Sequence, residues 1–589
     1  MLPTGDEVRL QAWLQLETWV SRVTGLLGFV GLVGIAVLTA GLRYLRLADP
    51  SHYYLYSPDS YFFHWLAQRA MAGQGPPTSA PEVNYTLQTG LAYPLAYIAK
   101  ATGSLFNLSA EQSLTLVAKF LPLALAVITL VALYFAASRI WGRQVALLTA
   151  LAWTFLFYAV FIGAGGYIDR DGLSVLLLLT GALIFFFFKD YRAHIGKIDV
   201  GWLLAGFGVL GVEGLLYLEW GFMGVILLVG IILSYVVVKP LMVYIGLLQN
   251  PSDTWLKIRT AVRKLEWRPL CLIAALNMVM LGAYYHQTGF WFPYYWGLFS
   301  ARLSGQPIEG SAGEVAGLSP WDLIFGFQLF LVLIAAGLYS AWKRKDDASI
   351  FFLGWFVSFF VLSLFSWRFL LYAVPAICVI AGLGLHHIWE WRRRGDYRLT
   401  KTVGVVVLLV LLIVFSSFGV ASLNSQSDMT IDENWQDALG YLKESTPQGA
   451  VIMSQWSYGY WILDVAQRTP FIDNGYYGYD LFKLYDVGRV YTATDPSQAA
   501  EIMAQCGTEY LVFSKADLDV AQAITTWAGL KGYDSFPVDS LVVRSLNGEF
   551  VSGGGLEVKY RNDEVVILEL TGSTAIGQTL QQPQFVIKS

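Results

Sequence analysis

Acidic residues suited to binding a metal ion recur along the apolar part of the chain. The stretch "GGYIDRDGL" contains the Asp-x-Asp pair Asp169 and Asp171, and "LYSPDSYFFHW" contains Asp59. Glu314 lies in "GSAGEVAGLSP", and Arg368 lies in "FSWRFLLYAVP". Carboxylate oxygens are the hard ligands that Mg²⁺ and Mn²⁺ prefer, and a divalent ion beside an arginine can stabilise a phosphate or pyrophosphate. Brought together, these residues would suit a phosphorylated substrate.

Each of these residues also has an ordinary explanation. A single Asp-x-Asp pair can be two solvated loop acids, and Asp59 within "SPDS" can be a turn residue. Glu314 beside glycines can be a solvated acid, and the Arg368 side chain can simply reach for the membrane surface. Only their occurrence together on one side of a membrane favours a metal and phosphate site, so the elements that carry them decide the interpretation.

The composition places most of the chain in a membrane. Of its 589 residues, 56% are hydrophobic and 14% are charged, and the mean hydropathy is +0.51. Soluble domains carry about 25% charged residues. The net charge of -4 gives no reason to propose a nucleic-acid partner, and the three cysteines are too far apart for a disulfide framework or a zinc site. We predict a polytopic α-helical membrane protein with a soluble part.

Apolar segments long enough to cross a bilayer, about 20 residues each, occur throughout the first two thirds of the chain. Residues 23–42 follow a segment of mixed charge and precede no small-residue cleavage site, so we predict an uncleaved first span rather than a signal peptide. The predicted spans lie near 23–42, 114–137, 144–163, 172–188, 201–217, 219–238, 269–285, 321–342, 350–366, 368–388 and 402–421.

Basic residues separate the loops between these spans into two sets. The loops after every even-numbered span hold most of the Lys and Arg, and the positive-inside rule assigns them to the cytoplasm. The odd number of spans then places the part of the chain that follows the last span on the exterior side. Asp59, Asp169, Asp171, Glu314 and Arg368 all fall on that same side.

Two domains are expected. Residues 1–421 form a multi-span transmembrane domain with long exterior loops at 43–113 and 286–320, and residues 422–589 form an exterior soluble α/β domain. In the second domain, "AVIM" and "YLVF" predict buried strands, "AAEIMAQC" predicts a helix, and "LEVKYRNDEVVILEL" predicts a strand pair. Long loops in a compact protein are usually functional.

An aromatic stretch without regular spacing, "MSQWSYGYW" at 453–461, lies in the predicted soluble domain. Taken alone, it favours a well-packed aromatic turn. On the exterior side of a membrane enzyme, it could instead contact a substrate.

At this point the chain resembles the catalytic subunit of oligosaccharyltransferases, a family of GT-C membrane glycosyltransferases that glycosylate asparagine. The similarity follows the family's motifs in order along most of the chain. The segments that carry it are "SPDSYFFHWLAQRAMAGQG", "FLPLALAVITLVALYFAASRIWGRQVALLTAL", "GGYIDRDGL", "SAGEVAGLSPW", "WRFLLYAVP" and "WQDALGYLKESTPQGAVIMSQWSYGYWI".

The resemblance implies a GT-C fold with about 11–13 transmembrane helices and a C-terminal exterior α/β domain. It implies an archaeal or bacterial single-subunit enzyme that transfers an oligosaccharide from a polyprenyl-(pyro)phosphate-linked donor to asparagine of exported proteins. The reaction would be inverting and would use Mn²⁺ or Mg²⁺. The partners would be the lipid-linked donor, the acceptor polypeptide and the membrane. The site would face the exterior of a multi-pass protein in the plasma membrane.

The resemblance also assigns roles to particular residues. Asp59, Asp169 and Asp171 would hold the metal ion, and Asp59 and Glu314 would engage the acceptor amide in catalysis. In the donor site, Arg368 would bind the pyrophosphate and Tyr460 would lie near the sugar.

One motif departs from the family pattern. The family signature is Trp-Trp-Asp-Tyr-Gly, whose first three residues bind the hydroxyl of the Ser or Thr two positions after the asparagine. The corresponding acceptor-binding residues here are Gln455, Trp456, Ser457, Tyr458 and Gly459. A charge-assisted hydrogen bond is worth roughly 1.5–3 kcal/mol, against about 1 kcal/mol for a neutral one. Replacing the carboxylate by Ser457 is therefore expected to weaken or alter recognition of the acceptor.

Two alternatives remain. The first is a related GT-C transferase that uses the same lipid-linked donor and a different acceptor, such as another protein motif, a lipid or a polymer. Ser457 supports it. The second is a non-catalytic scaffold subunit, which retention of the acidic residues and Arg368 argues against, because a scaffold does not need them.

Overall fold

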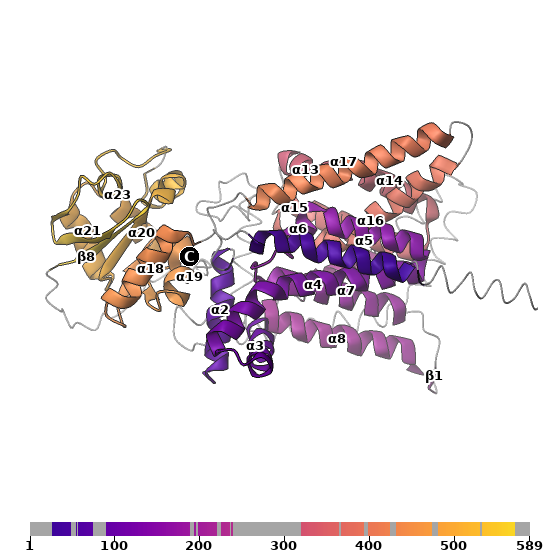
Figure 1. The fold of residues 1–589 in the computed structure, drawn as a ribbon, viewed down its shortest axis with the longest axis horizontal. Helices are drawn as coiled ribbons and strands as arrows, with labels where there is room; N and C mark the ends of the chain where they lie inside the picture. Colours follow the sequence, from indigo (N-terminus) through magenta and orange to yellow (C-terminus); the bar gives the residue numbers. More distant parts are fainter. Residues whose placement is uncertain are drawn as a thin grey trace, which may run out of the picture. The chain divides into compact units, whose positions relative to one another are not determined.

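The computed structural model describes two compact units, residues 1–430 and residues 431–589 (Figure 1). Glu314, the predicted seventh span at 269–285 and the predicted loop up to residue 319 lie outside the described residues. The residues described are 26, 28–48, 55, 57–74, 90–188, 194–195, 198–220, 225, 227–235, 237–239, 320–364, 367–393, 398–424, 431–473, 481–530 and 533–571.

The described residues of the first unit are helical apart from turns and one short strand pair, β1 (His194–Ile195) with β2 (Ile198–Asp199). Each predicted span within the described residues coincides with a helix or with two consecutive helices. The elements are Gly28–Tyr44, η1 (Leu45–Ala48), α2 (Pro58–Met71), α3 (Ala92–Phe106), α4 (Ala110–Trp141), α5 (Arg143–Phe155), α6 (Phe157–Phe161), α7 (Arg170–Phe188), α8 (Val200–Trp220), Leu227–Lys239, α13 (Pro320–Phe327), α14 (Phe330–Arg344), α15 (Asp347–Ser363), α16 (Arg368–Arg393) and α17 (Arg398–Asn424).

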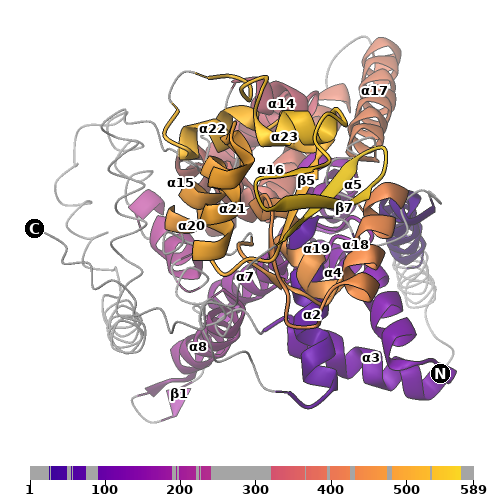
Figure 2. The same cartoon turned by 90° about the vertical axis from the view of Figure 1, so that its left-hand side faces the viewer.

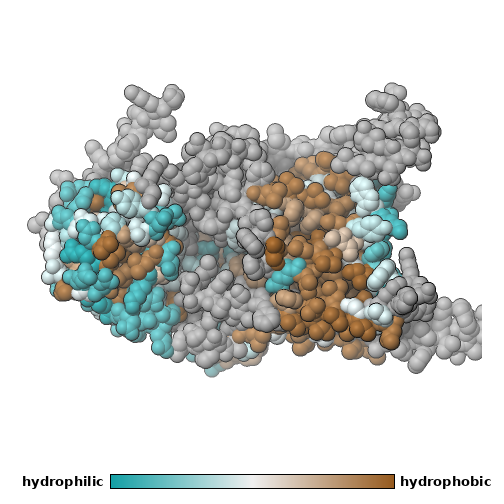
Figure 3. Space-filling view, turned by 90° about the horizontal axis from the view of Figure 1, so that it is seen from above, coloured by the Kyte–Doolittle hydropathy of each residue, from teal (hydrophilic) through white to brown (hydrophobic). Residues whose placement is uncertain are grey.

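By length and composition, α4, α7 and α16 are long and apolar enough to cross a membrane, and several other helices carry shorter apolar stretches. Large apolar side chains such as Phe135 and Phe207 are exposed on the outer helices. Figure 3 shows one side of the molecule, on which apolar residues cover much of the coloured surface of this unit. Such a surface is stable against lipid tails and unfavourable in water. The long apolar helices and the exposed apolar side chains confirm the predicted class, a polytopic helical membrane protein.

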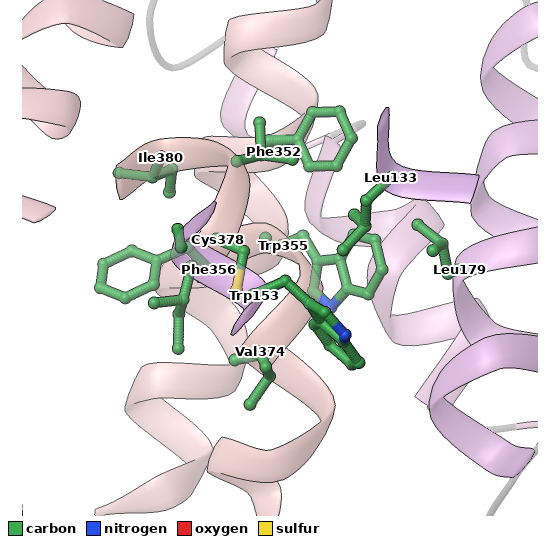
Figure 4. Close-up of a cluster of buried hydrophobic side chains, with 14 of the residues drawn as sticks. Leu133, Trp153, Leu179, Phe352, Trp355, Phe356, Val374, Cys378 and Ile380 are labelled. Carbon is green, nitrogen blue, oxygen red and sulfur yellow. The ribbon is translucent and has the colours of Figure 1, made fainter. Parts of the chain in front are cut away.

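Helix α16 forms the centre of the first unit, and nearly all of its residues from Leu370 to Leu385 are fully buried. It packs against α5, α14 and α15. Small residues permit these close approaches: a Cβ on Gly382 would collide with Thr149 of α5, and one on Gly384 would collide with the backbone of α14. Figure 4 shows this core, in which Trp153 of α5 and Trp355 of α15 lie beside Cys378 of α16.

In the described part of the predicted first exterior loop, the helices α2 and α3 pack against each other and against α4. Pro58 at the first position of α2 supplies a fixed φ that suits a helix start. Asp59 therefore lies in the first turn of a helix rather than in an open turn.

The second unit is built on a six-stranded mixed sheet, and its predicted strands and helix are confirmed. Strands β3, β4 and β5 are parallel, and the remaining neighbours are antiparallel. The order across the sheet is β4 (Thr469–Pro470), β3 (Val451–Met453), β5 (Tyr510–Ser514), β8 (Val565–Leu570), β7 (Leu556–Arg561) and β6 (Ser552–Gly553).

Helices of the second unit pack against this sheet (Figure 2). Alternate residues of β5, Leu511 and Phe513, join a core with the helices α20 to α23. Helix α18 packs against β7 and β8, and its buried residues Trp435, Ala438, Leu439 and Leu442 follow helical spacing. The elements are α18 (Glu433–Ser445), η6 (Trp456–Tyr458), α19 (Gly459–Asp464), α20 (Leu481–Thr492), α21 (Pro496–Gln505), η7 (Lys515–Leu518), α22 (Ala521–Trp527) and α23 (Leu541–Leu546).

Candidate functional site

The Asp-x-Asp pair and the predicted arginine meet inside the helical unit. Nη2 of Arg368 lies 3.7 Å from Oδ2 of Asp169 and 3.6 Å from Oδ2 of Asp171. Both carboxylates are buried, and the arginine side chain is 18% exposed. Asp169 precedes α7, Asp171 lies in its first turn, and Arg368 is the first residue of α16. The starts of two contacting helices, far apart in sequence, thus bring these three residues together.

Two tyrosines fix the orientation of the carboxylates. The Tyr167 hydroxyl donates to Oδ2 of Asp169 at 3.2 Å, and the Tyr372 hydroxyl donates to Oδ1 of Asp171 at 2.5 Å. The backbone N–H of Arg170 also donates to Asp169, at 2.6 Å. Sequence reasoning missed both tyrosines. For Tyr372 a signal existed, because it lies four residues after Arg368 and therefore on the same face of α16.

The charges at this site do not cancel. The pKa of Asp169, which lies in the turn before α7, is raised to about 8; burial is the main cause and the charge of the neighbouring Asp171 the next, while Arg368 acts to lower it. The charge of Asp59 also raises the pKa of Asp169, so Asp59 of α2 lies within electrostatic reach of the pair. The three carboxylates of Asp59, Asp169 and Asp171 outnumber the two guanidinium groups of Arg368 and Arg170 that act on them, which leaves an excess of negative charge. That excess favours either a proton or a cation.

The predicted three-carboxylate metal site is only partly assembled. Among the described residues, no three His, Cys, Asp or Glu side chains lie close enough together to hold a metal ion. The donor chemistry of Asp169 and Asp171 nevertheless fits a hard divalent cation, because both are buried carboxylates that Arg368 only partly neutralises. Asp169 also lines a small, mostly apolar pocket with Leu91 and Pro122.

The aromatic motif of the second unit follows the carboxyl end of β3. Because β3, β4 and β5 are parallel, their carboxyl ends share one edge of the sheet, where ligands of α/β folds commonly bind. Residues 455–459 therefore lie beside the residues that follow the other two strands. A Cβ on Gly459 would lie 2.5 Å from Cα of Asp473, which follows β4, so this close approach requires glycine.

Gln455 and Ser457 bond to each other. The Ser457 N–H donates to Oε1 of Gln455 at 2.8 Å, and Nε2 of Gln455 donates to Oγ of Ser457 at 3.0 Å. The Gln455 N–H donates to the hydroxyl of Tyr491 at 2.8 Å, which in turn donates to the Val512 carbonyl. Gln455 is 3% exposed and caps the short helix η6. Its side chain therefore holds the motif in shape.

Tyr458 belongs to the core of the second unit. Its ring centroid lies 4.3 Å from that of Trp435, and its hydroxyl donates to Oδ1 of Asp517 at 2.9 Å. The pKa of Asp517 is raised to about 7, because burial outweighs the hydrogen bonds from the Ser514 N–H and from Tyr458, which act to lower it. Packing thus accounts for Tyr458, as the aromatic-turn alternative predicted.

Two motif residues remain accessible. Trp456 and Ser457 are half-buried, whereas Tyr460 is 4% exposed. The Trp456 ring packs edge-on against Trp527 at the end of α22, with centroids 4.3 Å apart. Sequence reasoning missed Trp527, since 71 positions separate it from the motif and no local pattern links them.

A bundle of apolar helices with helices in its first long loop, followed by an α/β unit, agrees with the predicted GT-C fold. Solved structures support this assignment. Archaeal oligosaccharyltransferase AglB from Archaeoglobus fulgidus, in complex with an inhibitory peptide and a dolichol-phosphate, matches 91% of this chain and 79% of its own with a TM-score of 0.68 at 15% identity. ArnT from Cupriavidus metallidurans matches 94% of this chain and 99% of its own, with a TM-score of 0.53 at 12% identity.

Curated proteins confirm the predicted resemblance to the oligosaccharyltransferase family, although no protein-family model matches the chain. Subunit STT3 of the dolichyl-diphosphooligosaccharide–protein glycosyltransferase of Dictyostelium discoideum is 23% identical over 40% of this chain and 34% of its own. Subunit stt-3 of the corresponding glycosyltransferase of Caenorhabditis elegans is 22% identical over 48% of this chain and 43% of its own. The dolichyl-phosphooligosaccharide-protein glycotransferase 2 of Pyrococcus furiosus is 22% identical over 40% of this chain and 33% of its own. The matches thus span less than half of each relative.

Proposed function

We propose that this protein transfers an oligosaccharide from a polyprenyl-(pyro)phosphate-linked donor to asparagine of exported proteins, with inversion and with a divalent metal ion. The names of its relatives support the reaction class. The observation that carries the proposal is the convergence of Asp169, Asp171 and Arg368, because two buried acids and an arginine suit a metal-bound phosphate.

In this proposal Arg368 binds the donor pyrophosphate. A guanidinium can donate two parallel hydrogen bonds to phosphate oxygens, and its partly exposed position allows contact with a ligand. Asp169 and Asp171, with Asp59, would hold Mn²⁺ or Mg²⁺, which when bound supplies positive charge to the departing pyrophosphate. Tyr167 and Tyr372 keep the two carboxylates oriented. Tyr460 would lie near the donor sugar.

The acceptor amide needs activation because its nitrogen lone pair is delocalised into the carbonyl. Asp59 and Glu314 would accept hydrogen bonds from the amide N–H groups and twist the amide, which frees the lone pair for attack on the anomeric carbon. As the new C–N bond forms, the bond from that carbon to the pyrophosphate oxygen would break, and one of the two carboxylates would take up the amide proton. Such bonds accelerate the reaction only if they strengthen in the transition state.

Residues 455–459 would contact the polypeptide around the acceptor asparagine. The half-buried Trp456 and Ser457 are the members able to touch it directly, while Gln455, Tyr458 and Gly459 set the shape of the turn. We further propose that the second unit and the site face the exterior of the plasma membrane, as the basic loops predict.

A transfer assay tests this function. The purified protein is incubated with lipid extract from its source cells, Mn²⁺ and fluorescent peptides that contain Asn-x-Thr or Gln-x-Thr, and Asp59→Ala serves as the inactive control. Modification of only the Asn-x-Thr peptide is expected. Modification of both peptides, or equal activity of Asp59→Ala, would contradict the proposal.

A second candidate function keeps the donor and changes the acceptor. Ser457 bonds Gln455 where the family has a carboxylate, and this favours an acceptor without the usual Ser or Thr hydroxyl. If no peptide is modified while a donor is still bound, this candidate replaces the first. The affinity for Mn²⁺ tests separately whether the protein is a non-catalytic scaffold. In that case the wild type would bind Mn²⁺ no more tightly than the variants Asp169→Ala and Asp171→Ala.

A further inference from the structure

Arg43, in the last turn of the helix Gly28–Tyr44, is buried with 1% exposure. Its Nη2 donates to the carbonyls of Trp153 at 3.2 Å and Ala159 at 2.7 Å, and its Nη1 donates to the Thr39 carbonyl at 3.2 Å. Among the described residues, Arg43 forms no ion pair with a carboxylate. A buried charge is costly unless polar groups compensate it. Backbone carbonyls do so here.

Two of these carbonyls lie on either side of a helix break. Helix α5 ends at Phe155, Leu156 is extended with φ -65° and ψ 123°, and α6 begins at Phe157. Carbonyls at the end of a helix lack intrahelical donors, and a cation there also interacts favourably with the helix dipole. The Arg43 guanidinium thus joins the end of α5 to α6.

The same residue contacts the glycine turn that follows α6. The Arg43 carbonyl accepts the Gly165 N–H at 3.1 Å. A Cβ on Gly163 would lie 2.7 Å from Nε of Arg43 and 2.6 Å from Cβ of Ala126, so only glycine allows the contact. Gly166, which follows Gly165, has φ +79°, and its N–H donates to the Lys119 carbonyl of α4 at 3.0 Å. Tyr167 and Asp169 follow this turn directly.

We infer that Arg43 is a positioning residue for the Asp169–Asp171 pair. Its guanidinium fixes the α5–α6 break and its backbone fixes the glycine turn, so the chain enters the motif with Tyr167 beside Asp169 and both acids toward Arg368. Arg43 touches neither acid. The inference rests on the proposed function only where it concerns metal and donor binding, since the hold on the turn can be measured by itself.

The variants Arg43→Lys and Gly163→Ala test this role. Lysine keeps the charge and loses the planar fork that reaches carbonyls on both sides of the break. Alanine at 163 keeps Arg43 and displaces the turn from it. Thr154→Val is the matched control: Thr154 hydrogen-bonds Thr39 at 2.7 Å and so joins α5 to the same helix. Within the described part of the chain, the Thr154 hydroxyl bonds Thr39 and the Ala150 carbonyl, and both of these lie outside residues 157–169.

Hydrogen exchange of the full-length protein in detergent is measured first. In Arg43→Lys and Gly163→Ala, amides of residues 157–169 are expected to exchange about tenfold faster than in the wild type, because each change removes bonds that hold the turn closed. Thr154→Val is expected to leave this segment unchanged. Wild-type exchange in both test variants, or an equal increase in Thr154→Val, would overturn the inference.

The affinity for Mn²⁺ is the second readout. Residues that orient metal ligands typically contribute about 10–100-fold to metal affinity, so both test variants are expected to bind Mn²⁺ at least tenfold more weakly than Thr154→Val. Equal affinities would also overturn the inference. If the wild type itself binds no Mn²⁺ and transfers no glycan, the proposed function fails, whereas the exchange experiment still decides whether Arg43 holds the turn.

Discussion

The Tyr372 hydroxyl donates a 2.5 Å hydrogen bond to Oδ1 of Asp171 across 201 positions of the chain. Tyr372 is fully buried in α16, four residues after Arg368, which lies near the other oxygen of the same carboxylate. One face of α16 therefore contacts Asp171 with a neutral donor and with a cation. Each oxygen of the Asp171 carboxylate therefore has a partner on the same helix.

Tyr372→Phe should reduce activity without unfolding the protein. The change removes the donor to Asp171 and leaves the ring in place, and loss of such an orienting bond typically costs about 10–100-fold in activity or metal affinity. Initial rates of glycan transfer and the dissociation constant for Mn²⁺ measure the effect. Tyr339→Phe, at a 55% exposed position of α14, is the control. Rates equal to this control would refute an orienting role for Tyr372.

Arg368→Lys should weaken donor binding. Lysine retains the positive charge near Asp169 and Asp171 but cannot donate two parallel bonds to a pyrophosphate. We expect the KM for the lipid-linked donor to rise about tenfold, corresponding to one lost charge-assisted bond, while the KM for the peptide is unchanged. Arg344→Lys, in the last turn of α14, serves as the matched control. A larger effect on the peptide KM than on the donor KM would place Arg368 elsewhere in the reaction.

Ser457→Asp should improve recognition of acceptors that carry a hydroxyl. Nε2 of Gln455 already donates to the side chain at 457, and a carboxylate could accept that bond and a second one from the acceptor hydroxyl. The difference between a charge-assisted and a neutral bond predicts a KM about tenfold lower for Asn-x-Thr peptides. An Asn-x-Val peptide, which lacks the hydroxyl, is the control substrate. If the KM falls equally for both peptides, position 457 does not read the hydroxyl.

Asp517 should make the second unit less stable as the pH rises. Its pKa is raised to about 7 in the fold, mainly by burial, against about 4 in an unfolded chain. Between these values the folded state binds more protons than the unfolded state, so the free energy of unfolding decreases with rising pH. Relative to the wild type, Asp517→Asn is expected to become progressively more stable from about pH 5 to about pH 7.

Denaturant unfolding, followed by the fluorescence of buried tryptophans, measures this dependence. Asp519→Asn is the matched control, because it alters an acid at the C-cap of the same short helix η7. A constant stability difference between wild type and Asp517→Asn across this pH range would show that Asp517 is ionised throughout.

Much of the fold could be predicted from the sequence because a bilayer imposes a simple length and polarity rule. The spans near 114–137 and 368–388, and the strands at "AVIM" and "YLVF", all follow from local apolar patterns. The helix α3 within the first loop could not be predicted in this way. Its apolar residues pack partly against α4, and a short mixed segment gives no clear period.

The candidate site was predictable only in part. Asp169, Asp171 and Arg368 are charged residues at the ends of apolar helices, which makes them conspicuous in the sequence. Tyr372 could have been found from its position four residues after Arg368 on α16, but Trp527 is one aromatic residue among many others, and only tertiary packing gives it a role. The bond between Gln455 and Ser457 depends on the local turn, so their side chains offered no signal of it.

The most direct test of the whole account is the mass of an Asn-x-Thr peptide after incubation with purified protein, lipid extract from the source cells and Mn²⁺. We expect the peptide to gain the mass of a glycan, a chelator to abolish the gain, and Asp171→Asn to reduce its rate about 100-fold. A peptide of unchanged mass despite a donor present in the extract, or an Asp171→Asn protein as active as the wild type, would contradict it.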